Sequence, residues 1–226
     1  MMLELTFHDA GSRRENAALT KLVVAGWTGR DAAAVAHHIA ELEALGVPPP
    51  SRTPIFYVAS LSRVTCAGAI EVLGRDTSGE AEFVLLRHEG TLWVGLGSDH
   101  TDRKLETFGV AASKQICDKP IGTEFWRYDA VAPHWDQIKL RSYATINGKR
   151  ELYQDGSVAQ MLSPESLLSL YNDGGVLPDG TVMFCGTLAA IGGIRPAGRF
   201  ECELIDPVLQ RSIRCGYDIN VLPIVS

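Results

Sequence analysis

The sequence lacks the features that would assign the chain to a membrane or to nucleic acid. Its longest apolar stretches, such as residues 182–190, stop well short of the ~20 residues that a bilayer span requires. Lys and Arg number 21 against 27 Asp and Glu, and the net charge of −6 argues against an anionic partner surface. The first residues contain neither a basic nor a sustained apolar segment, so no secretory signal and a cytoplasmic location are expected.

Cysteine is also scarce and irregularly spaced. The five cysteines are an odd number, and no two of them form a Cys-x-x-Cys pair, which fits neither a disulfide framework nor a zinc site. Reduced thiols packed as small apolar side chains are therefore favoured over a catalytic thiol. These residues are Cys66, Cys117, Cys185, Cys202 and Cys215.

Length and composition favour a single α+β domain over residues 1–226. With 46% apolar residues, the chain can form one substantial core. Short strand patterns dominate and few helices are indicated, which favours curled, mixed sheets over a βαβ repeat. Strands are predicted at 3–8, 21–25, 55–58, 69–73, 81–87, 92–96, 138–146, 181–187, 199–205 and 210–215.

Local signals mark two helices and one hairpin. A helix is predicted over 28–45, where Thr28 and Asp31 form a capping-box-like start. A second helix is predicted over 163–172, because it begins with a serine cap, a proline and a glutamate. The Asn-Gly pair at 147–148 predicts a hairpin turn, since both residue types tolerate positive φ.

Three acidic residues near predicted strand ends form a candidate metal site. Glu80 and Glu82 share one face of a strand because side chains alternate along it, and Asp99 follows the next apolar run. A pair on a solvated strand face is the alternative. However, Glu82 leads directly into apolar residues, where two unpaired carboxylates would repel each other and lose hydration. Mg²⁺ or Mn²⁺ would relieve both effects, with Ca²⁺ as an alternative, and His100 is expected behind the site rather than as a ligand.

Other residues are candidates for catalysis or substrate binding. His38 and Glu41 lie three apart on the first predicted helix and share a face. A carboxylate raises the basicity of an imidazole, as proton abstraction requires, although such pairs are more often found on helix surfaces. Lys114 is a third candidate, and the alternative interpretation is that it is an ordinary surface lysine. Gly186 and Thr187 follow an apolar strand, at a position suited to anchoring a ligand oxygen.

Taken in order, these segments resemble the catalytic domain of the fumarylacetoacetate hydrolase superfamily over roughly residues 22–222. The short motifs of that superfamily have counterparts in the same order at residues 38–41, 54–57, 80–82, 98–103, 114–122, 154–156 and 186–188. Three departures indicate a divergent bacterial branch: Ala59 replaces a lysine, Glu106 a glutamine and Leu188 a proline. Because these positions touch substrate in the family, the resemblance supports fold and metal more than substrate identity.

The resemblance implies a mixed β-roll or sandwich with few short helices, usually assembled as a homodimer. Residues 1–50 would supply N-terminal strands and the helix, and residues 51–226 the β-roll core. Glu80, Glu82 and Asp99 would hold the ion, which would chelate the oxygens of a keto acid or 1,3-dicarbonyl. In the same resemblance, His38 would carry the proton and Glu41 would orient it, while Lys114 would balance negative charge. The residues that would contact substrate are Arg103, Gly186 and Thr187.

The predicted function is a divalent-metal-dependent hydrolase that cleaves a carbon–carbon bond through a metal enolate. Decarboxylation, hydration or tautomerisation of a 2-keto acid are alternatives on the same site, since one enolate leads to all of them. A catalytically silent metabolite-binding dimer is the alternative from another class. No nucleic-acid or membrane partner is expected.

Overall fold

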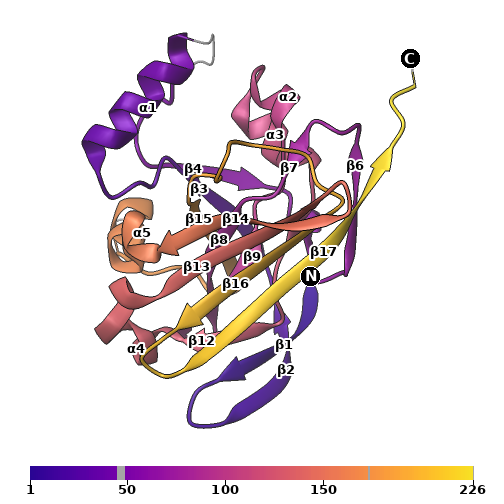
Figure 1. Cartoon of the computed structure of the whole chain (residues 1–226). Coiled ribbons are helices and arrows are strands. Elements are labelled where there is room, and N and C mark those ends of the chain that lie inside the picture. The colour runs from indigo at the N-terminus through magenta and orange to yellow at the C-terminus, as the bar shows by residue number, and fades with distance from the viewer. Residues whose placement is uncertain (45–48, 173, 226) are drawn as a thin grey trace.

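Two β-sheets form most of the protein, a computed structural model that describes residues 1–44, 49–172 and 174–225 (Figure 1). The side chains of residues 38, 41, 42 and 44 also lie outside the described part. The large sheet has the strand order β2 (Ser12–Ala18), β1 (Met2–His8), β12 (Glu124–Arg127), β9 (Thr91–Ser98), β8 (Ala81–His88), β15 (Thr181–Thr187), β3 (Lys21–Gly26) and β4 (Ile55–Ala59). The small sheet has the order β14 (Lys149–Ser157), β13 (Lys139–Ile146), β16 (Arg199–Asp206), β17 (Arg211–Leu222) and β6 (Ala69–Leu73). Two short pairs join β10 (Thr101–Asp102) to β7 (Thr77–Ser78) and β11 (Lys119–Pro120) to β5 (Val64–Thr65).

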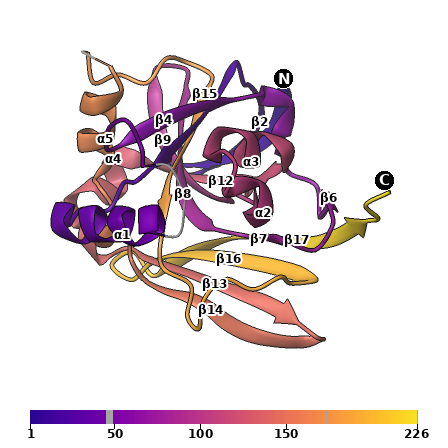
Figure 2. The same cartoon turned by 90° about the horizontal axis from the view of Figure 1, so that it is seen from above.

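The two sheets lie in separate layers, with an apolar core between them (Figure 2). Strand β8 shows how the layers are built. Its residues Phe83 and Leu85 belong to the core shared with the small sheet, whereas Val84 and Leu86 belong to a second apolar cluster on the opposite face. Because alternate side chains of a strand point to opposite faces, β8 is buried on both sides and reads as a continuous apolar run.

Two hairpins are closed by two-residue turns in which both residues have positive φ. The turn between β13 and β14 is Asn147-Gly148, with φ of 50° and 78°, which confirms the hairpin prediction. The turn between β8 and β9 is Glu89-Gly90, with φ of 48° and 72°. Such turns match the twist of the flanking strands and fix which residues face each other across the hairpin.

The first helix is α1 (Ala32–Ala44), which begins later than the sequence indicates. The carboxylate of Asp31 accepts hydrogen bonds from the backbone N–H groups of Ala33 and Ala34, at 2.9 and 3.1 Å. Thr28 takes no part in this cap because it is buried, and its carbonyl accepts from Leu162 N at 2.8 Å. The predicted end of this helix falls at residues 45–48, outside the described part of the chain.

The other helical segments are short. Ser163 caps α5 (Pro164–Tyr171) by accepting from Ser166 N, in agreement with the prediction. Among the described residues, no helix is both long and apolar enough to cross a membrane. The remaining helices are α2 (Arg103–Glu106), α3 (Val110–Ile116) and α4 (Tyr128–Val131), with 3-10 turns at Leu61–Arg63, Ala132–Gln137 and Val158–Gln160.

Most predicted strands are present, but the prediction lacks three longer strands and the four two-residue strands β5, β7, β10 and β11. Strands β2, β12 and β14 carry charged residues and lack a clear apolar alternation. Strand β17 continues to Leu222, past the predicted end at Cys215, although Gly216 interrupts the pattern. The five cysteines are free, as expected, and burial raises the pKa of the Cys66 thiol to about 11.

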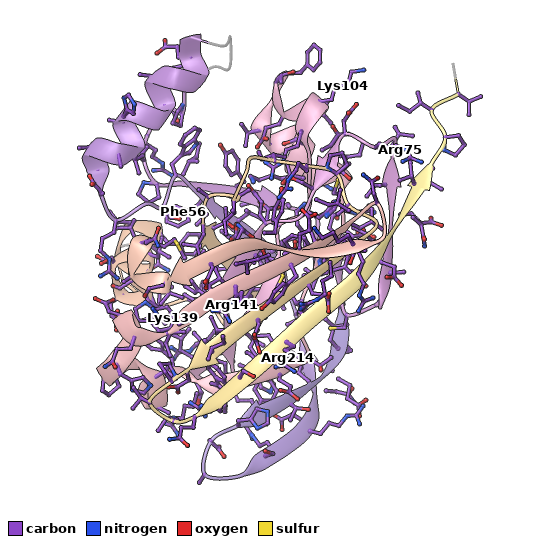
Figure 3. All side chains as sticks on the ribbon, in the orientation of Figure 1. Phe56, Arg75, Lys104, Lys139, Arg141 and Arg214 are labelled. Atoms are coloured by element: carbon purple, nitrogen blue, oxygen red, sulfur yellow. The ribbon has the colours of Figure 1, made fainter. Side chains whose placement is uncertain are left out.

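The outer face of the small sheet is charged. Lys139, Arg141 and Arg214 project from it (Figure 3). Arg141 pairs with Asp155 at 3.1 Å and Arg214 with Glu203 at 2.7 Å, each across a strand boundary. The small sheet, which is antiparallel except for the pair β17 and β6, therefore has one face in the core and one in water.

Candidate functional site

Two neighbouring central strands of the large sheet, β8 and β9, bring the candidate metal ligands together at one end of the strands. Strands β8 and β9 are antiparallel with Ala81 opposite Ser98, so the start of one lies beside the end of the other. Asp99 N also donates a hydrogen bond to Glu80 O at 3.0 Å. As a result, carboxylate oxygens of Glu80, Glu82 and Asp99 lie within 4.8 Å of one another.

Glu82 is a buried carboxylate with no ion-pair partner among the described side chains. It is 2% exposed, and one of its oxygens accepts a hydrogen bond from Gly186 N at 2.7 Å. Burial, and then the carboxylates of Asp99 and Glu80, raise the pKa of Glu82 well above its usual range. Its charged form is therefore disfavoured unless a cation compensates it.

Asp99 is also buried, but it is held between two ammonium groups. Lys114 Nζ donates to Asp99 Oδ2, and Lys119 Nζ lies 3.2 Å from Asp99 Oδ1. Burial alone would raise the pKa of Asp99, but the two lysines lower it to about 2. Burial likewise opposes the charge on Lys114, yet Asp99 and Glu80 raise the pKa of Lys114 well above its usual range. Asp99 and Lys114 are therefore both charged at neutral pH.

Arg103 positions the third carboxylate. Its Nη2 lies 2.9 Å from Glu80 Oε1, its Nη1 lies 2.9 Å from Glu106 Oε2, and its Nε donates to Ser78 Oγ at 2.7 Å. The other oxygen of Glu80 lies 3.7 Å from Lys114 Nζ. All three guanidinium nitrogens thus contact protein groups, and the expected contact of Arg103 with substrate stays a prediction.

Gly186 and Thr187 lie beside Glu82 at the end of β15, where a register shift interrupts the pairing with β8. The Thr187 hydroxyl donates to Ala81 O at 2.7 Å and accepts from the side-chain amide of Gln154, also at 2.7 Å. Gly186 has φ of 100°, a backbone conformation that favours glycine. These groups hold the carboxylate strand in place, and their predicted contact with substrate is not tested by this geometry.

His100 lies behind the carboxylates rather than among them. It is fully buried, and its Nδ1 is 2.9 Å from the Tyr217 hydroxyl, which is 2.8 Å from Ser98 Oγ. Burial, and then the nearby Lys119 and Arg103, lower the pKa of His100 to about 3, so the ring is neutral. His100 supports the segment that carries Asp99.

The donor set fits a hard divalent cation. All three side chains offer carboxylate oxygens, the ligand type that Mg²⁺, Mn²⁺ and Ca²⁺ prefer. Ion-to-oxygen distances of about 2.0–2.6 Å place opposite ligands about 4–5 Å apart, and oxygens that all lie within 4.8 Å of one another are compatible with that separation. Glu82, buried and uncompensated, is the residue that most needs such an ion.

His38 and Glu41 belong to α1, but their side chains lie outside the described part of the chain. Their roles as proton carrier and orienting carboxylate therefore stay predictions. The described side chains of this helix include the exposed His37 and the half-buried Val35 and Ile39.

Two residues that hold the site were not among the sequence candidates. Lys119 is fully buried beneath Asp99, and Gln154 is 1% exposed beside Thr187. Both lie within motif segments of the family resemblance, but a lysine and a glutamine in those positions look like ordinary surface residues. Only burial, which depends on distant parts of the chain, distinguishes them.

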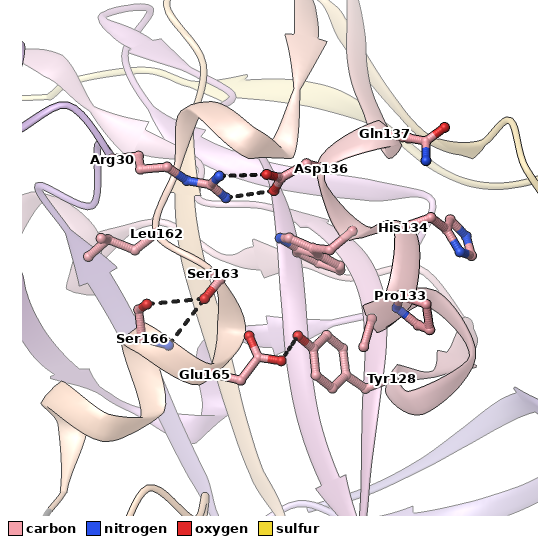
Figure 4. A pocket seen from close by; sticks show the side chains of 12 residues that line it. Arg30, Tyr128, Pro133, His134, Asp136, Gln137, Leu162, Ser163, Glu165 and Ser166 are labelled. Atoms are coloured by element: carbon pink, nitrogen blue, oxygen red, sulfur yellow. Dashed lines mark hydrogen bonds and ion pairs between the residues drawn. The ribbon is translucent and has the colours of Figure 1, made fainter.

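A separate pocket of about 540 Å³ lies between α4, the following 3-10 turn and α5 (Figure 4). Arg30 pairs with Asp136 across it at 2.8 Å, and the Tyr128 hydroxyl donates to Glu165. Burial, and then Glu165, raise the pKa of Tyr128 well above its usual range. The pocket shares no lining residue with the carboxylate cluster.

Comparisons with known proteins give one family and several structural neighbours. The family model described as "Protein of unknown function (DUF2848)" matches residues 25–217. A comparison with curated protein sequences gives no significant match.

The structural neighbours share the fold at low sequence identity. The crystal structure of Cg1458 has a TM-score of 0.65 and 17% identity, covering 94% of this chain and 81% of that chain. A hexagonal crystal form of 2-keto-3-deoxyarabinonate dehydratase has a TM-score of 0.65 and 15% identity, covering 96% and 79%. The same enzyme complexed with magnesium and 2,5-dioxopentanoate has a TM-score of 0.64 and 15% identity, also covering 96% and 79%. The predicted fold is confirmed as that of the fumarylacetoacetate hydrolase superfamily.

Proposed function

The chain belongs to the DUF2848 family, and we propose that it is a divalent-metal-dependent enzyme acting on a keto acid or 1,3-dicarbonyl metabolite. The proposed reaction is hydrolysis of a carbon–carbon bond beside a carbonyl group. The shared fold supports this class, since one structural neighbour is a dehydratase described with magnesium and a dioxo acid.

One observation carries the proposal: Glu82 is buried beside two other carboxylates and has no ion pair of its own among the described residues. In a purely structural cluster, removing such a charge from water without a partner would be strongly unfavourable. A functional cation site accounts for why the chain tolerates it.

The residues of the chain have distinct tasks in this proposal. Glu80, Glu82 and Asp99 hold Mg²⁺ or Mn²⁺, and the bound ion would polarise the carbonyl oxygens of the substrate. Lys114 lies at the cluster and stabilises negative charge that develops on the substrate oxygen. Arg103 fixes the orientation of Glu80 from the side.

The proton-transfer step is assigned to α1. His38, oriented by Glu41, takes a proton from the attacking water and later delivers one to the leaving carbon. Gly186 and Thr187 bind the far end of the substrate in the same proposal. Hydrolysis balances in this scheme, because water supplies the hydroxyl that remains on the acyl carbon and the proton that the departing carbon gains.

A second candidate reaction is dehydration of a 2-keto-3-deoxy sugar acid. The observation that favours it is the similarity to a 2-keto-3-deoxyarabinonate dehydratase over 96% of the chain. The same basic group would remove a proton next to the carbonyl, and a hydroxyl group would leave as water. This reaction needs a hydroxyl group on the fourth carbon, one carbon beyond the site of proton removal, rather than a cleavable acyl bond.

Calorimetric titration with Mn²⁺ tests the metal centre directly. Wild-type protein is expected to bind one ion per chain, and Glu82→Gln to lose that binding. Glu71→Gln provides the matched control, because Glu71 is exposed on β6 and lies outside the cluster. Equal affinity in all three proteins would remove Glu82 from the ligand set.

Product analysis by NMR then separates the reactions. The Mn²⁺-loaded protein is incubated with an acylpyruvate, with oxaloacetate and with a 2-keto-3-deoxy sugar acid. Hydrolysis yields two carboxylic acids or an acid and a ketone, whereas dehydration yields a single product lacking one water. Binding of these compounds without any turnover would favour the silent metabolite-binding protein instead.

A further inference from the structure

The carboxylate cluster is surrounded by an unusual number of positive charges. Arg103 contacts Glu80, Lys114 contacts both Glu80 and Asp99, and Lys119 lies against Asp99. Three cations therefore contact two of the three proposed ligands, Glu80 and Asp99. One further carboxylate, on Glu106, pairs with Arg103 from the rim. With all groups ionised, this network of four carboxylates and three cations has a net charge of only −1.

Lys119 is the least expected of the three cations. Its side chain is fully buried, and its Nζ lies 2.6 Å from His100 O, 3.1 Å from Cys117 O and 3.2 Å from Asp99 Oδ1. Two backbone carbonyls accept hydrogen bonds from this nitrogen, and its ammonium group forms an ion pair with Asp99. Lys119 therefore contributes a fixed positive charge that cannot swing out into water.

These charges change the electrostatics of loading the site. Three carboxylates that bind a dication with no other charges nearby would form a complex with one net negative charge. With the neighbouring cations included, adding a dication takes the network from −1 to +1 in a largely buried place. An uncompensated charge is unfavourable there, because a buried site of low dielectric constant neither solvates the charge nor screens it well. A ligand carrying one or two negative charges restores the balance.

We propose that the fixed charges of Lys119, Lys114 and Arg103 make divalent-metal binding depend on an anionic ligand bound beside the ion. This inference rests on the metal centre of the proposed function. It assigns Lys119 as a residue that sets specificity, and it selects carboxylate-bearing 2-keto acids over neutral 1,3-dicarbonyls. The metal and the acid then bind as a pair, and each raises the affinity for the other by the same factor.

Mn²⁺ affinity measured by calorimetry with two matched compounds tests the coupling. Pyruvate carries a keto oxygen and a carboxylate, whereas methyl pyruvate keeps the keto oxygen and lacks the charge. Saturating pyruvate is expected to tighten Mn²⁺ binding about tenfold or more, after correction for the weak complex in solution. Methyl pyruvate is expected to leave Mn²⁺ affinity unchanged.

Two lysine variants locate the effect. Lys119→Met removes the buried charge and is expected to tighten Mn²⁺ binding without ligand and to reduce the enhancement by pyruvate. Lys104→Met removes an exposed lysine on α2, next to Arg103 in the chain, and is expected to behave as wild type. A structural role for Lys119 alone would change stability but not the ratio of the two Mn²⁺ affinities.

The outcomes separate this inference from the proposed function. Mn²⁺ binding that is equally tight with and without pyruvate overturns the coupling and leaves the metal centre intact. Equal enhancement by pyruvate and methyl pyruvate overturns the role of charge. Absence of Mn²⁺ binding under every condition overturns the metal centre and this inference with it. If circular dichroism shows that Lys119→Met does not fold, the comparison of the two compounds on wild-type protein decides.

Discussion

The side-chain amide nitrogen of Gln154 donates a hydrogen bond to the Thr187 hydroxyl at 2.7 Å, and so ties the small sheet to the end of β15 beside the candidate site. The same nitrogen donates to Leu188 O at 2.6 Å. The amide oxygen accepts from Ala81 N at 3.0 Å and from Ser142 Oγ at 2.7 Å. One buried side chain thus satisfies groups on β8, β13 and the end of β15.

Replacing Gln154 with Leu should destabilise the protein. The change leaves buried donors and acceptors without partners, and each costs about 1–3 kcal/mol. We expect the free energy of unfolding in urea to fall by about 3 kcal/mol in total. Gln137→Leu is the control, because Gln137 is exposed. If both variants unfold at the same urea concentration as wild type, the network does not stabilise the fold.

Replacing Gly186 with Ala should be far more harmful than its size suggests. A Cβ atom at this position would lie 1.7 Å from Thr28 Oγ1, and φ is 100°. Overpacking and backbone strain together should reduce the free energy of unfolding by about 3 kcal/mol. Gly11→Ala offers a control, since a Cβ there meets nothing within 4 Å. Thermal unfolding of the two variants gives the comparison, and a similar melting temperature for both would contradict the packing argument.

Asp206 should make stability depend on pH in the acid range. Burial alone would raise the pKa of Asp206, but hydrogen bonds from Leu209 N, His134 and Arg211 lower it below its usual 3.8. Since the folded pKa is depressed, the stabilisation is complete above about pH 4 and is lost as pH falls through the folded value.

Urea unfolding at several pH values checks this dependence. Asp206→Asn should be less stable than wild type at pH 6 and should lose less stability between pH 4 and pH 2. Asp76→Asn serves as the control, because Asp76 is exposed. Parallel curves for wild type and Asp206→Asn would show that this carboxylate does not contribute to the acid transition.

Replacing His38 with Ala should separate catalysis from metal binding. As a general base, His38 contributes about 10²–10⁴-fold to turnover, whereas Mn²⁺ affinity depends on the three carboxylates. His37→Ala is the neighbouring control on the same helix, where His37 is exposed. A turnover number equal to that of wild type would exclude His38 as the base.

The sequence predicts the three carboxylates because their signal is local. Glu80, Glu82 and Asp99 lie at the ends of two apolar runs that form one hairpin, and strand alternation is enough to place them on one side. The start of the first helix is less predictable. Thr28 satisfies the local capping pattern, but its carbonyl accepts a hydrogen bond from the distant Leu162 N, and the side chain of Thr28 is buried.

The cations around the site could not be read from local pattern. Lys119 follows Asp118 in an unremarkable polar stretch, and nothing in that stretch indicates full burial. Its position depends on β11 pairing with β5, which lies more than fifty residues earlier in the chain. Long-range pairing of this kind leaves no periodic pattern in the sequence. Strand β2 is missed for another reason, since its charged residues are typical of an edge strand and give no apolar alternation.

The tight turn at Glu89-Gly90 has a consequence for how this protein tolerates change. Because that turn helps to fix the register of β8 against β9, one residue inserted there would move every partner by a single place and exchange the two buried faces of the strand. An insertion at this end of the hairpin, opposite to the end that carries the carboxylates, would thereby separate the three proposed ligands. The sequence would still contain all of them.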